Sequence, residues 1–342
     1  MKQATGRIVS LIAAVALVAV GALVLGSCAP AAPKVSKIAI VVKSLGNGFF
    51  DAVRDGGQEA AKELGNTEII YQGPSTPTAE GQIEIIDSLI AQKVQGIAIS
   101  ANDRDALIPI TKKAMSKGIK VISFDSGISK DGRMVDLVPS VTDLIGKQQV
   151  ELVSGLVGGE GEIAILSATS QATNQNAWID VMKAELASNP AYAKLKLVAT
   201  VYGDDLADKS YREAVGLFEA HPKLKGIIAP TTVGIAAAGK AITDKKLIGK
   251  VQLTGLGLPS EMKFYVDNGA CQKFALWNPI DLGYTSVQIV NALIKKQVTG
   301  KDGDVVKAGR MGDIKIGADG GAVMGVPFVF DKTTIEKFSK MF

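Results

Sequence analysis

The sequence predicts an α/β protein with two doubly wound parallel-sheet domains, and two observations carry this prediction. Short apolar runs rich in Val, Ile and Leu recur along the chain without strict alternation, as expected of parallel strands buried on both faces. Amphipathic stretches lie between these runs, and alternation of strands and helices requires a parallel sheet with right-handed crossovers. The expected strands cover residues 38–42, 68–71, 96–100, 120–124, 162–166, 197–202, 226–229, 252–256 and 273–277.

The stretches between the strands carry helix signals. Ile83, Ile86 and Ile90 follow the three-to-four spacing of one apolar helix face. The stretch 105–117 ends in Lys-Gly, which is a usual helix stop, and 207–221 ends at a proline. Several predicted strands are therefore followed by a segment that can return the chain along the sheet.

The strands fall into two series, so the chain should cross between two domains. The first series ends near residue 124, and the extended piece 134–138 is the candidate for the first crossing. A second crossing is expected after Trp277 and a third near Gly309. The expected N-terminal lobe is 37–138 with 279–308, and the expected C-terminal lobe is 139–278 with 309–342.

The beginning of the chain has the pattern of a secretory signal peptide, expected over residues 1–27. Lys2 and Arg7 precede the apolar run 8–25, and the segment ends in Leu25-Gly-Ser-Cys28, which resembles a lipobox. We therefore expect lipidation of Cys28 and a tether over 28–36, rich in Ala and Pro. The alternative is an uncleaved anchor, since the apolar run is just long enough to span a bilayer.

Composition narrows the function classes. The net charge of +4 gives no indication of nucleic-acid binding. His221 is the one histidine, and only Cys271 accompanies the expected lipidated cysteine, so no His/Cys metal cluster and no cofactor are expected. The stretch 234–241 resembles a phosphate-binding loop but lacks its final Ser or Thr, and 255–260 lacks the third glycine of a dinucleotide fingerprint.

Polar and aromatic residues follow the predicted strands at their carboxyl ends, where open parallel sheets bind ligands. They suit a small sugar, because Asp, Asn, Gln and Lys pair with hydroxyl groups while Phe or Trp covers the apolar face of a ring. Unpaired hydroxyls would cost about 1–3 kcal/mol each on burial, so many polar partners are expected. The candidate ligand-binding residues are Lys43, Asn47, Phe49, Phe50, Asn102, Asp103, Asp125, Asn174, Gln175, Trp178, Pro230, Thr231, Thr232, Trp277 and Asn278.

Several of these residues also have a structural interpretation. Asp103 and Asp125 are equally compatible with helix caps, and Phe49 or Phe50 with the core. From residue 37 onward, however, the chain resembles the type I periplasmic sugar-binding proteins, relatives of the ribose-binding protein. The stretches that carry the resemblance are 42–50, 100–106, 123–126 and 276–279. It implies two α/β domains, three hinge strands and a cleft that closes on a sugar.

Two branches of that family are similar to this chain. The rhamnose-binding proteins of ABC importers resemble it over 172–178, 202–211, 229–234, 255–262 and 309–312. The autoinducer-2 receptors have ligand residues that match Lys43, Asp125, Gln175 and Pro230. Their second aspartate falls at Asn174 and their alanine at Thr232, and because Asn donates where Asp only accepts, a different hydroxyl pattern is expected. The resemblance favours rhamnose or a similar deoxyhexose.

The resemblance implies a monomeric, lipid-anchored substrate-binding protein outside the cytoplasm, partnered by an ABC permease and without catalytic residues. The expected sugar contacts come from Asp125 and Lys43 in the first lobe and from the polar residues 174, 175 and 231 in the second. A sensor subunit for a membrane receptor would have the same fold. A transcription regulator would need an N-terminal helix-turn-helix, and an enzyme is disfavoured by the shortage of His and Cys.

Overall fold

The structure is a computed structural model that describes residues 35–342. The expected signal peptide, Cys28 and the tether up to residue 34 lie outside the described residues. No helix in the described part combines the length and apolarity needed to cross a membrane. Residues 36–342 form one compact unit, which contains two lobes that each have a parallel sheet. The predicted α/β fold with two doubly wound sheets is confirmed.

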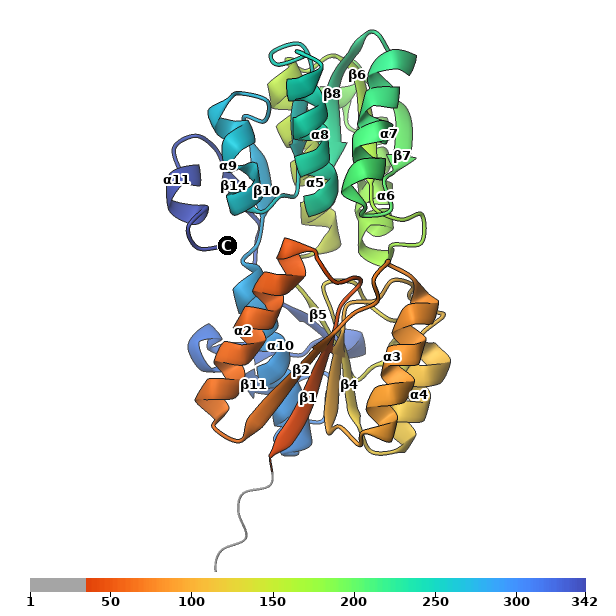
Figure 1. Ribbon diagram of the computed structural model, residues 1–342, viewed down its shortest axis with the longest axis vertical. Helices are drawn as coiled ribbons and strands as arrows, with labels where there is room; N and C mark the ends of the chain where they lie inside the picture. Colours follow the sequence, from red (N-terminus) through yellow and green to blue (C-terminus); the bar gives the residue numbers. More distant parts are fainter. Residues whose placement is uncertain (1–34) are drawn as a thin grey trace, which may run out of the picture. The chain divides into compact units, whose positions relative to one another are not determined.

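A six-stranded, fully parallel sheet forms the N-terminal lobe (Figure 1). Its strand order is β13-β5-β4-β3-β1-β2. The strands are β1 (Ser36–Val41), β2 (Thr67–Gln72), β3 (Gly96–Ile99), β4 (Lys120–Phe124), β5 (Val135–Val138) and β13 (Gly321–Val323). Its helices are α2 (Gly48–Leu64), α3 (Ala79–Ala91), α4 (Ile108–Ser116) and α10 (Pro279–Ile294).

Both faces of this sheet are covered, which explains why the strand sequences do not alternate. In β1, Ile38 and Ile40 belong to the core under α2 and α10, whereas Ala39 and Val41 belong to a second core under α3 and α4. Helices α2 and α10 approach closely through glycines: a Cβ on Gly56 would lie 1.8 Å from the Ile280 carbonyl oxygen. Any larger residue at that position would push the two helices apart.

The C-terminal lobe has a four-stranded parallel sheet of order β7-β6-β8-β9. Its strands are β6 (Gly161–Ser167), β7 (Leu195–Tyr202), β8 (Leu224–Ala229) and β9 (Gln252–Gly255). Its helices are α5 (Thr142–Val157), α6 (Thr173–Ser188), α7 (Ala207–Ala220), α8 (Thr232–Asp244), α9 (Pro259–Asp267) and α11 (Ile335–Phe338). The stretch that resembles a phosphate-binding loop lies inside α8, so it is helix and not loop.

Short elements complete both lobes. Strands β10 (Phe274–Leu276) and β14 (Phe328–Phe330) pair antiparallel beside the C-terminal sheet, and β11 (Val305–Lys307) pairs antiparallel with β12 (Asp313–Lys315). Four single-turn 3₁₀ helices occupy loops: η1 (Lys130–Gly132), η2 (Pro190–Tyr192), η3 (Gly309–Met311) and η4 (Ala318–Gly320).

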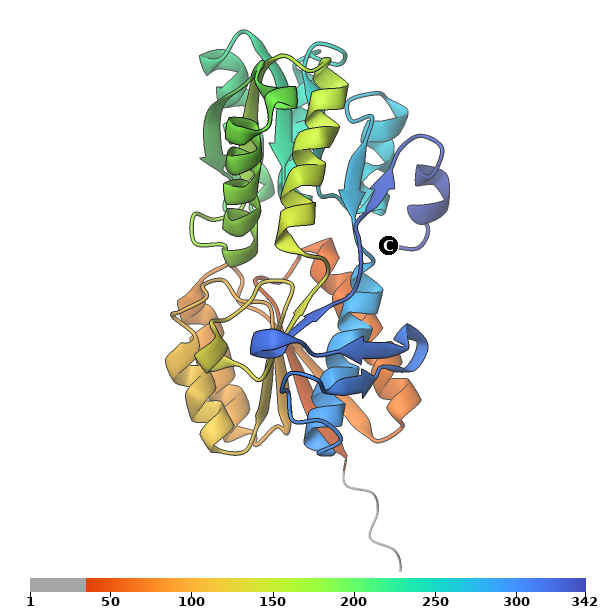
Figure 2. The same cartoon turned by 180° about the vertical axis from the view of Figure 1, so that it is seen from behind.

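Three connections join the lobes. The first follows β5, and the second lies between β10 and α10. The third runs from β13 to β14 through residues 324–327, as Figure 2 shows from behind. The prediction of a crossing near Gly309 is therefore wrong, because β13 pairs with β5 and keeps 309–323 in the N-terminal lobe. Gly309 instead allows the backbone to pass close to Tyr284, because a Cβ at this position would lie 2.0 Å from the Tyr284 hydroxyl oxygen.

Candidate functional site

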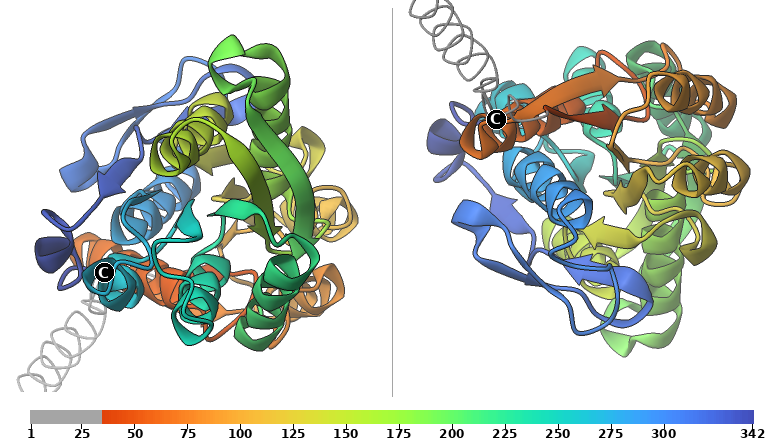
Figure 3. Two further views of the ribbon diagram at one scale, coloured as in Figure 1. Left: turned by 90° about the horizontal axis from the view of Figure 1, so that it is seen from above. Right: turned by 90° about the horizontal axis from the view of Figure 1, so that it is seen from below.

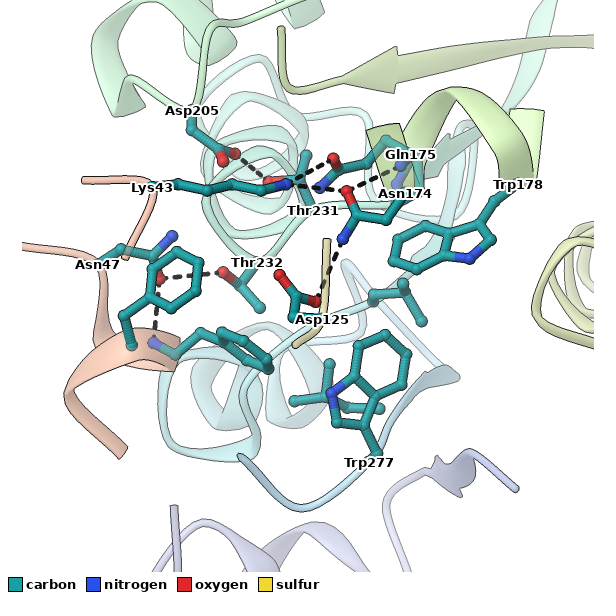
Figure 4. A pocket seen from close by; sticks show the side chains of 15 residues that line it. Lys43, Asn47, Asp125, Asn174, Gln175, Trp178, Asp205, Thr231, Thr232 and Trp277 are labelled. Carbon is teal, nitrogen blue, oxygen red and sulfur yellow. Dashed lines mark hydrogen bonds between the residues drawn. The ribbon is translucent and has the colours of Figure 1, made fainter. Parts of the chain in front are cut away.

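A pocket lies between the two lobes, at the carboxyl ends of the strands of both sheets. Figure 4 shows side chains from both lobes pointing into it, and its cavity volume is about 30 Å³. It is lined by Lys43, Asn47, Phe49, Phe50, Asp125, Asn174, Gln175, Trp178, Asp205, Pro230, Thr231, Thr232, Leu256, Leu276 and Trp277. Twelve of the fifteen sequence-predicted residues therefore come together here.

Lys43 reaches across the cleft from the N-terminal lobe. It follows β1, and its ammonium group donates to Asn174 Oδ1 at 2.8 Å and to Gln175 Oε1 at 3.2 Å. The side chain is buried, and this burial lowers the pKa of Lys43, although the negative charges of Asp125 and Asp205 act in the opposite direction. The ammonium group is thus held by neutral amide oxygens, with both carboxylates close enough to affect its charge.

Asp125 is fixed in the pocket by its own lobe. It follows β4 with φ at 59°, a left-handed conformation that is strained for a residue other than glycine. Its carboxylate accepts hydrogen bonds from Ser100 Oγ at 2.8 Å and from Asn174 Nδ2 at 3.2 Å. Burial raises the pKa of Asp125, and the nearby charge of Lys43 and the Ser100 hydrogen bond oppose this rise.

The amide of Asn174 links these two groups. It lies in the first turn of α6, where its oxygen accepts from Lys43 and from the Gln175 backbone N–H, while its nitrogen donates to Asp125. An aspartate at this position could accept from Lys43 but could not donate to Asp125. The amide therefore fits this arrangement better than the carboxylate that the autoinducer-2 pattern has there.

Asp205 is a pocket residue that the sequence analysis missed. It follows β7 with φ at 51°, and its carboxylate accepts a hydrogen bond from the Thr231 hydroxyl. Burial raises the pKa of Asp205, while Lys43 opposes the rise. A signal was available, because Asp205 follows the carboxyl end of a predicted strand. Leu256 and Leu276 were also missed, since both lie inside predicted strands, where a leucine is expected in the core.

Aromatic rings form the opposite wall. The ring of Trp277 lies 5.8 Å from that of Trp178 and 6.2 Å from that of Phe49, both in edge-to-face geometry. Phe50 packs edge-to-face on Phe49 at 5.2 Å. The pocket therefore has a wall of charged and amide groups facing a wall of rings, as Figure 4 shows.

The polar wall continues through two residues that meet across the cleft. Asn47 caps α2 by accepting from the Phe49 N–H at 3.0 Å, and the same oxygen accepts from Thr232 Oγ1 of the other lobe at 3.3 Å. Both side chains are buried. Pro230 directly follows β8, and α8 begins at the pocket two residues later, at Thr232.

Three predicted site residues do not line the pocket. Asn102 lies behind it and donates to the Lys43 carbonyl oxygen at 2.9 Å and to the Thr78 carbonyl oxygen at 3.1 Å, so it holds the loop that carries Lys43. Asp103 accepts from two backbone N–H groups in its own turn. Asn278 caps α10 by accepting from the Ile280 N–H at 3.0 Å.

The pocket offers hydrogen bonds and ring faces to a small polar ligand. Within residues 35–342, no group of three or more His, Cys, Asp or Glu side chains is placed to hold a metal ion. The cavity has room for a few water molecules, whereas pockets for small ligands have volumes of about 300–1,000 Å³. A ligand with the size of a sugar therefore requires the lobes to separate, and it must replace the hydrogen bonds between them.

Comparison with known proteins gives the family. A model of the periplasmic binding protein domain matches residues 38–298. An ABC transporter solute-binding protein from Clostridium phytofermentas, solved with bound L-rhamnose, is 39% identical; the match covers 90% of this chain and 99% of that chain, with a TM-score of 0.86. A sugar ABC transporter structure from Actinomyces odontolyticus is 40% identical, covering 89% and 97%, with a TM-score of 0.72.

Among characterised relatives, the D-allose-binding periplasmic protein of Escherichia coli is 25% identical over 75% of this chain and 83% of its own length. These relatives bind or transport their ligands. The family match covers most of the described residues, including the strands and loops that build the pocket. The chain belongs to the periplasmic binding protein family, and it is a substrate-binding protein and not an enzyme.

Proposed function

We propose that the chain is the extracytoplasmic substrate-binding protein of an ABC sugar importer, with L-rhamnose or a similar deoxyhexose as its ligand. The observation that carries the proposal is the division of the pocket into a polar wall and an aromatic wall. A deoxyhexose has the same division, because its hydroxyl groups lie on some edges and its methyl group and C–H face are apolar. The L-rhamnose bound by the similar Clostridium protein supports this choice.

The hydroxyl groups of the sugar would take over the hydrogen bonds that now join the lobes. Lys43 would donate to them, Asp125 would accept from them, and the amides of Asn174 and Gln175 could do both. The rings of Trp178 and Trp277 would cover the apolar face. Because the ligand would bridge both lobes, it would favour the closed conformation through motion at the three connections.

The N-terminal segment supports a membrane location for this function. The proposed mature protein begins at Cys28, whose lipid would hold it beside the permease that receives the sugar. An acyl chain contributes about 0.8 kcal/mol for each buried methylene group. The protein would act as a monomer, as the resemblance to the sugar-binding proteins implies.

Isothermal titration calorimetry of the soluble chain 29–342 tests the ligand directly. The titrants are L-rhamnose, other deoxyhexoses, ribose, other pentoses and autoinducer-2. We expect tight one-to-one binding of L-rhamnose and weak binding of the others. Binding of autoinducer-2 alone would mean that Asn174 and Thr232 are compatible with that ligand and would replace the proposal with a signalling role. No binding of any of these ligands would refute the assignment.

A further inference from the structure

A second groove lies at the end of the N-terminal lobe that faces away from the pocket. Its cavity volume is about 840 Å³. It is bordered by the carboxyl-terminal ends of α3, α4 and α10 and by the residues that enter β3 and β4, so it lies at the amino-terminal edge of the sheet. The right-hand view of Figure 3 shows this end of the lobe, with the helix ends surrounding the sheet.

The charged side chains that line this groove are all lysines: Lys93, Lys117, Lys120 and Lys296. No Asp or Glu lines it, and among the described residues none of the four lysines has an ion-pair partner within 4.0 Å. Three of them are exposed, and Lys120 is half-buried. Apolar side chains form the floor beneath this ring of positive charge, including Val94, Ile119 and Ile294.

Two of these lysines occupy backbone positions that favour glycine. Lys93 has φ at 56° and Lys296 has φ at 57°, and each directly follows the cap of a helix. A left-handed residue other than glycine is destabilising there. The negative ends of the helix dipoles favour a lysine at each helix terminus. They do not explain why four lysines meet around one groove without a single carboxylate.

The groove lies beside the first strand of the folded chain. The Gln95 side chain, which lines the groove, accepts from the Lys37 backbone N–H at 2.7 Å, and the Gln95 N–H donates to the Lys37 carbonyl oxygen at 2.9 Å. Ser36 begins β1 only eight residues after Cys28. Eight residues span at most about 26–29 Å when fully extended, so a lipid on Cys28 would keep this end of the lobe near the bilayer surface.

We propose that this lysine-lined groove docks on the anionic phospholipid headgroups of the membrane that carries the anchor. The positive rim would contact headgroup phosphates while the protein is not engaged with the permease, and this contact would be released when the pocket turns to the permease for delivery. Each lysine near an anionic surface strengthens adsorption about fivefold. The orientation of the lobe on its membrane rests on the proposed lipidation of Cys28, whereas adsorption of the groove to anionic headgroups does not require the lipid.

Vesicle sedimentation with the chain 29–342 tests the groove without an acyl chain. The folded residues 36–342 form one compact unit, so this protein contains the complete groove. The vesicles contain phosphatidylcholine and phosphatidylglycerol at about three to one, or phosphatidylcholine alone. We expect adsorption to the anionic vesicles at low salt, loss of adsorption at high salt where surface charges are screened, and no adsorption to the neutral vesicles.

The test variant combines Lys93→Gln, Lys117→Gln and Lys296→Gln. We expect adsorption about a hundredfold weaker, at about fivefold for each lysine. The matched control combines Lys196→Gln, Lys223→Gln and Lys225→Gln, which removes the same charge from exposed positions of the C-terminal lobe. The control should adsorb like the unmodified chain. Equal loss in both variants, adsorption to neutral vesicles, or no adsorption by the unmodified chain would overturn the proposal.

Sugar titration of the same three proteins separates this proposal from the proposed function. Lysines at the groove are remote from the pocket, so all three proteins should bind L-rhamnose with the same affinity. Vesicle adsorption without sugar binding would refute the ligand and leave the docking surface intact. Sugar binding without adsorption would refute the docking surface and leave the ligand intact.

Discussion

The two lobes supply the pocket with polar groups that are held in different ways. In the N-terminal lobe, Asp125 is fixed by Ser100 of the same lobe, and the Asn47 oxygen accepts from a backbone N–H of its own helix. In the C-terminal lobe, the Asn174 oxygen accepts from the Gln175 N–H of its own helix, but the other partners of the Asn174 and Gln175 amides lie across the cleft, on Lys43 and Asp125. Thr231 and Asp205 are the pair that the C-terminal lobe completes by itself.

This difference has a consequence for the order of binding. When the lobes separate, Asp125 keeps its hydrogen bond from Ser100 and Asn47 keeps the one from the Phe49 N–H. The Lys43 ammonium group, the Gln175 oxygen and the Asn174 nitrogen lose their partners to water, and Asn174 keeps only the hydrogen bond from the Gln175 N–H. A preformed half binds a ligand with less loss of entropy than a half that must reorganise. We therefore expect the sugar to bind the N-terminal lobe first and the C-terminal lobe to close over it.

The largest effect is expected for Asp125→Ala, which removes the charged acceptor of the preformed half. Loss of a hydrogen bond to a charged group costs about 1.5–3 kcal/mol, so L-rhamnose affinity should fall at least tenfold by calorimetry. Asp103→Ala is the matched control, because Asp103 also follows a strand but accepts only from its own turn. An unchanged dissociation constant in Asp125→Ala would remove this residue from the site.

Asn174→Asp should weaken binding by about tenfold near neutral pH, because it places a second carboxylate against Asp125. The nearby like charge raises the pKa of both carboxyl groups, so protonation at lower pH should restore affinity in part. Titrations at several pH values measure this recovery. The control is Asn176→Asp, since Asn176 donates to the Ser170 carbonyl oxygen outside the pocket. Wild-type affinity in Asn174→Asp at every pH would contradict the bridging role of the amide.

Ser100→Ala should have a smaller effect on the part of the pocket that the N-terminal lobe supplies. It removes the hydrogen bond that fixes Asp125 within its own lobe, and a net loss of about 1 kcal/mol corresponds to about fivefold weaker sugar binding. Ser126→Ala is the control, because the Ser126 hydroxyl is buried and has no hydrogen-bond partner among the described residues. If both variants bind alike, the Ser100 contact does not organise the site.

The last prediction concerns a different quantity, the pH dependence of stability. Burial lowers the pKa of Lys43, so the folded protein binds fewer protons than the unfolded chain between this lowered pKa and 10.5. Stability attributable to Lys43 should therefore rise as pH rises through this window, by at most about 1.4 kcal/mol per pH unit. The free energy of unfolding, measured in urea, should therefore rise with pH in the wild type relative to Lys43→Met. A constant difference between them would contradict the lowered pKa.

The sequence predicted the two sheets because each strand carries a local apolar signal. The third crossing was misplaced because its signal is not local: β13 is three residues long, begins at the second of two consecutive glycines, and is defined by its pairing with β5. Nothing in the stretch 321–323 alone distinguishes it from a turn. The lobe to which residues 309–323 belong could only be found from that pairing in the structure.

The site was predicted by one rule, namely that polar and aromatic residues at the carboxyl ends of the strands bind the ligand. The limits of this rule explain the errors. Asp103 and Asp125 both follow strands, but the left-handed backbone at Asp125 turns its carboxylate into the cleft, whereas Asp103 accepts from its own turn. Asp205 satisfies the same rule, and its importance appears only through contact with Thr231, 26 residues further along the chain. Residue type and strand position predict the candidates, and tertiary contacts select among them.

Fluorescence titration with L-rhamnose tests the central claim most directly, namely that a deoxyhexose binds between the lobes. The chain has two tryptophans, Trp178 and Trp277, and both line the pocket. A sugar bound there must change their surroundings, so we predict a saturable change in tryptophan emission with the same dissociation constant as calorimetry. Calorimetric binding of L-rhamnose with no change in tryptophan emission would place the sugar elsewhere and contradict the account.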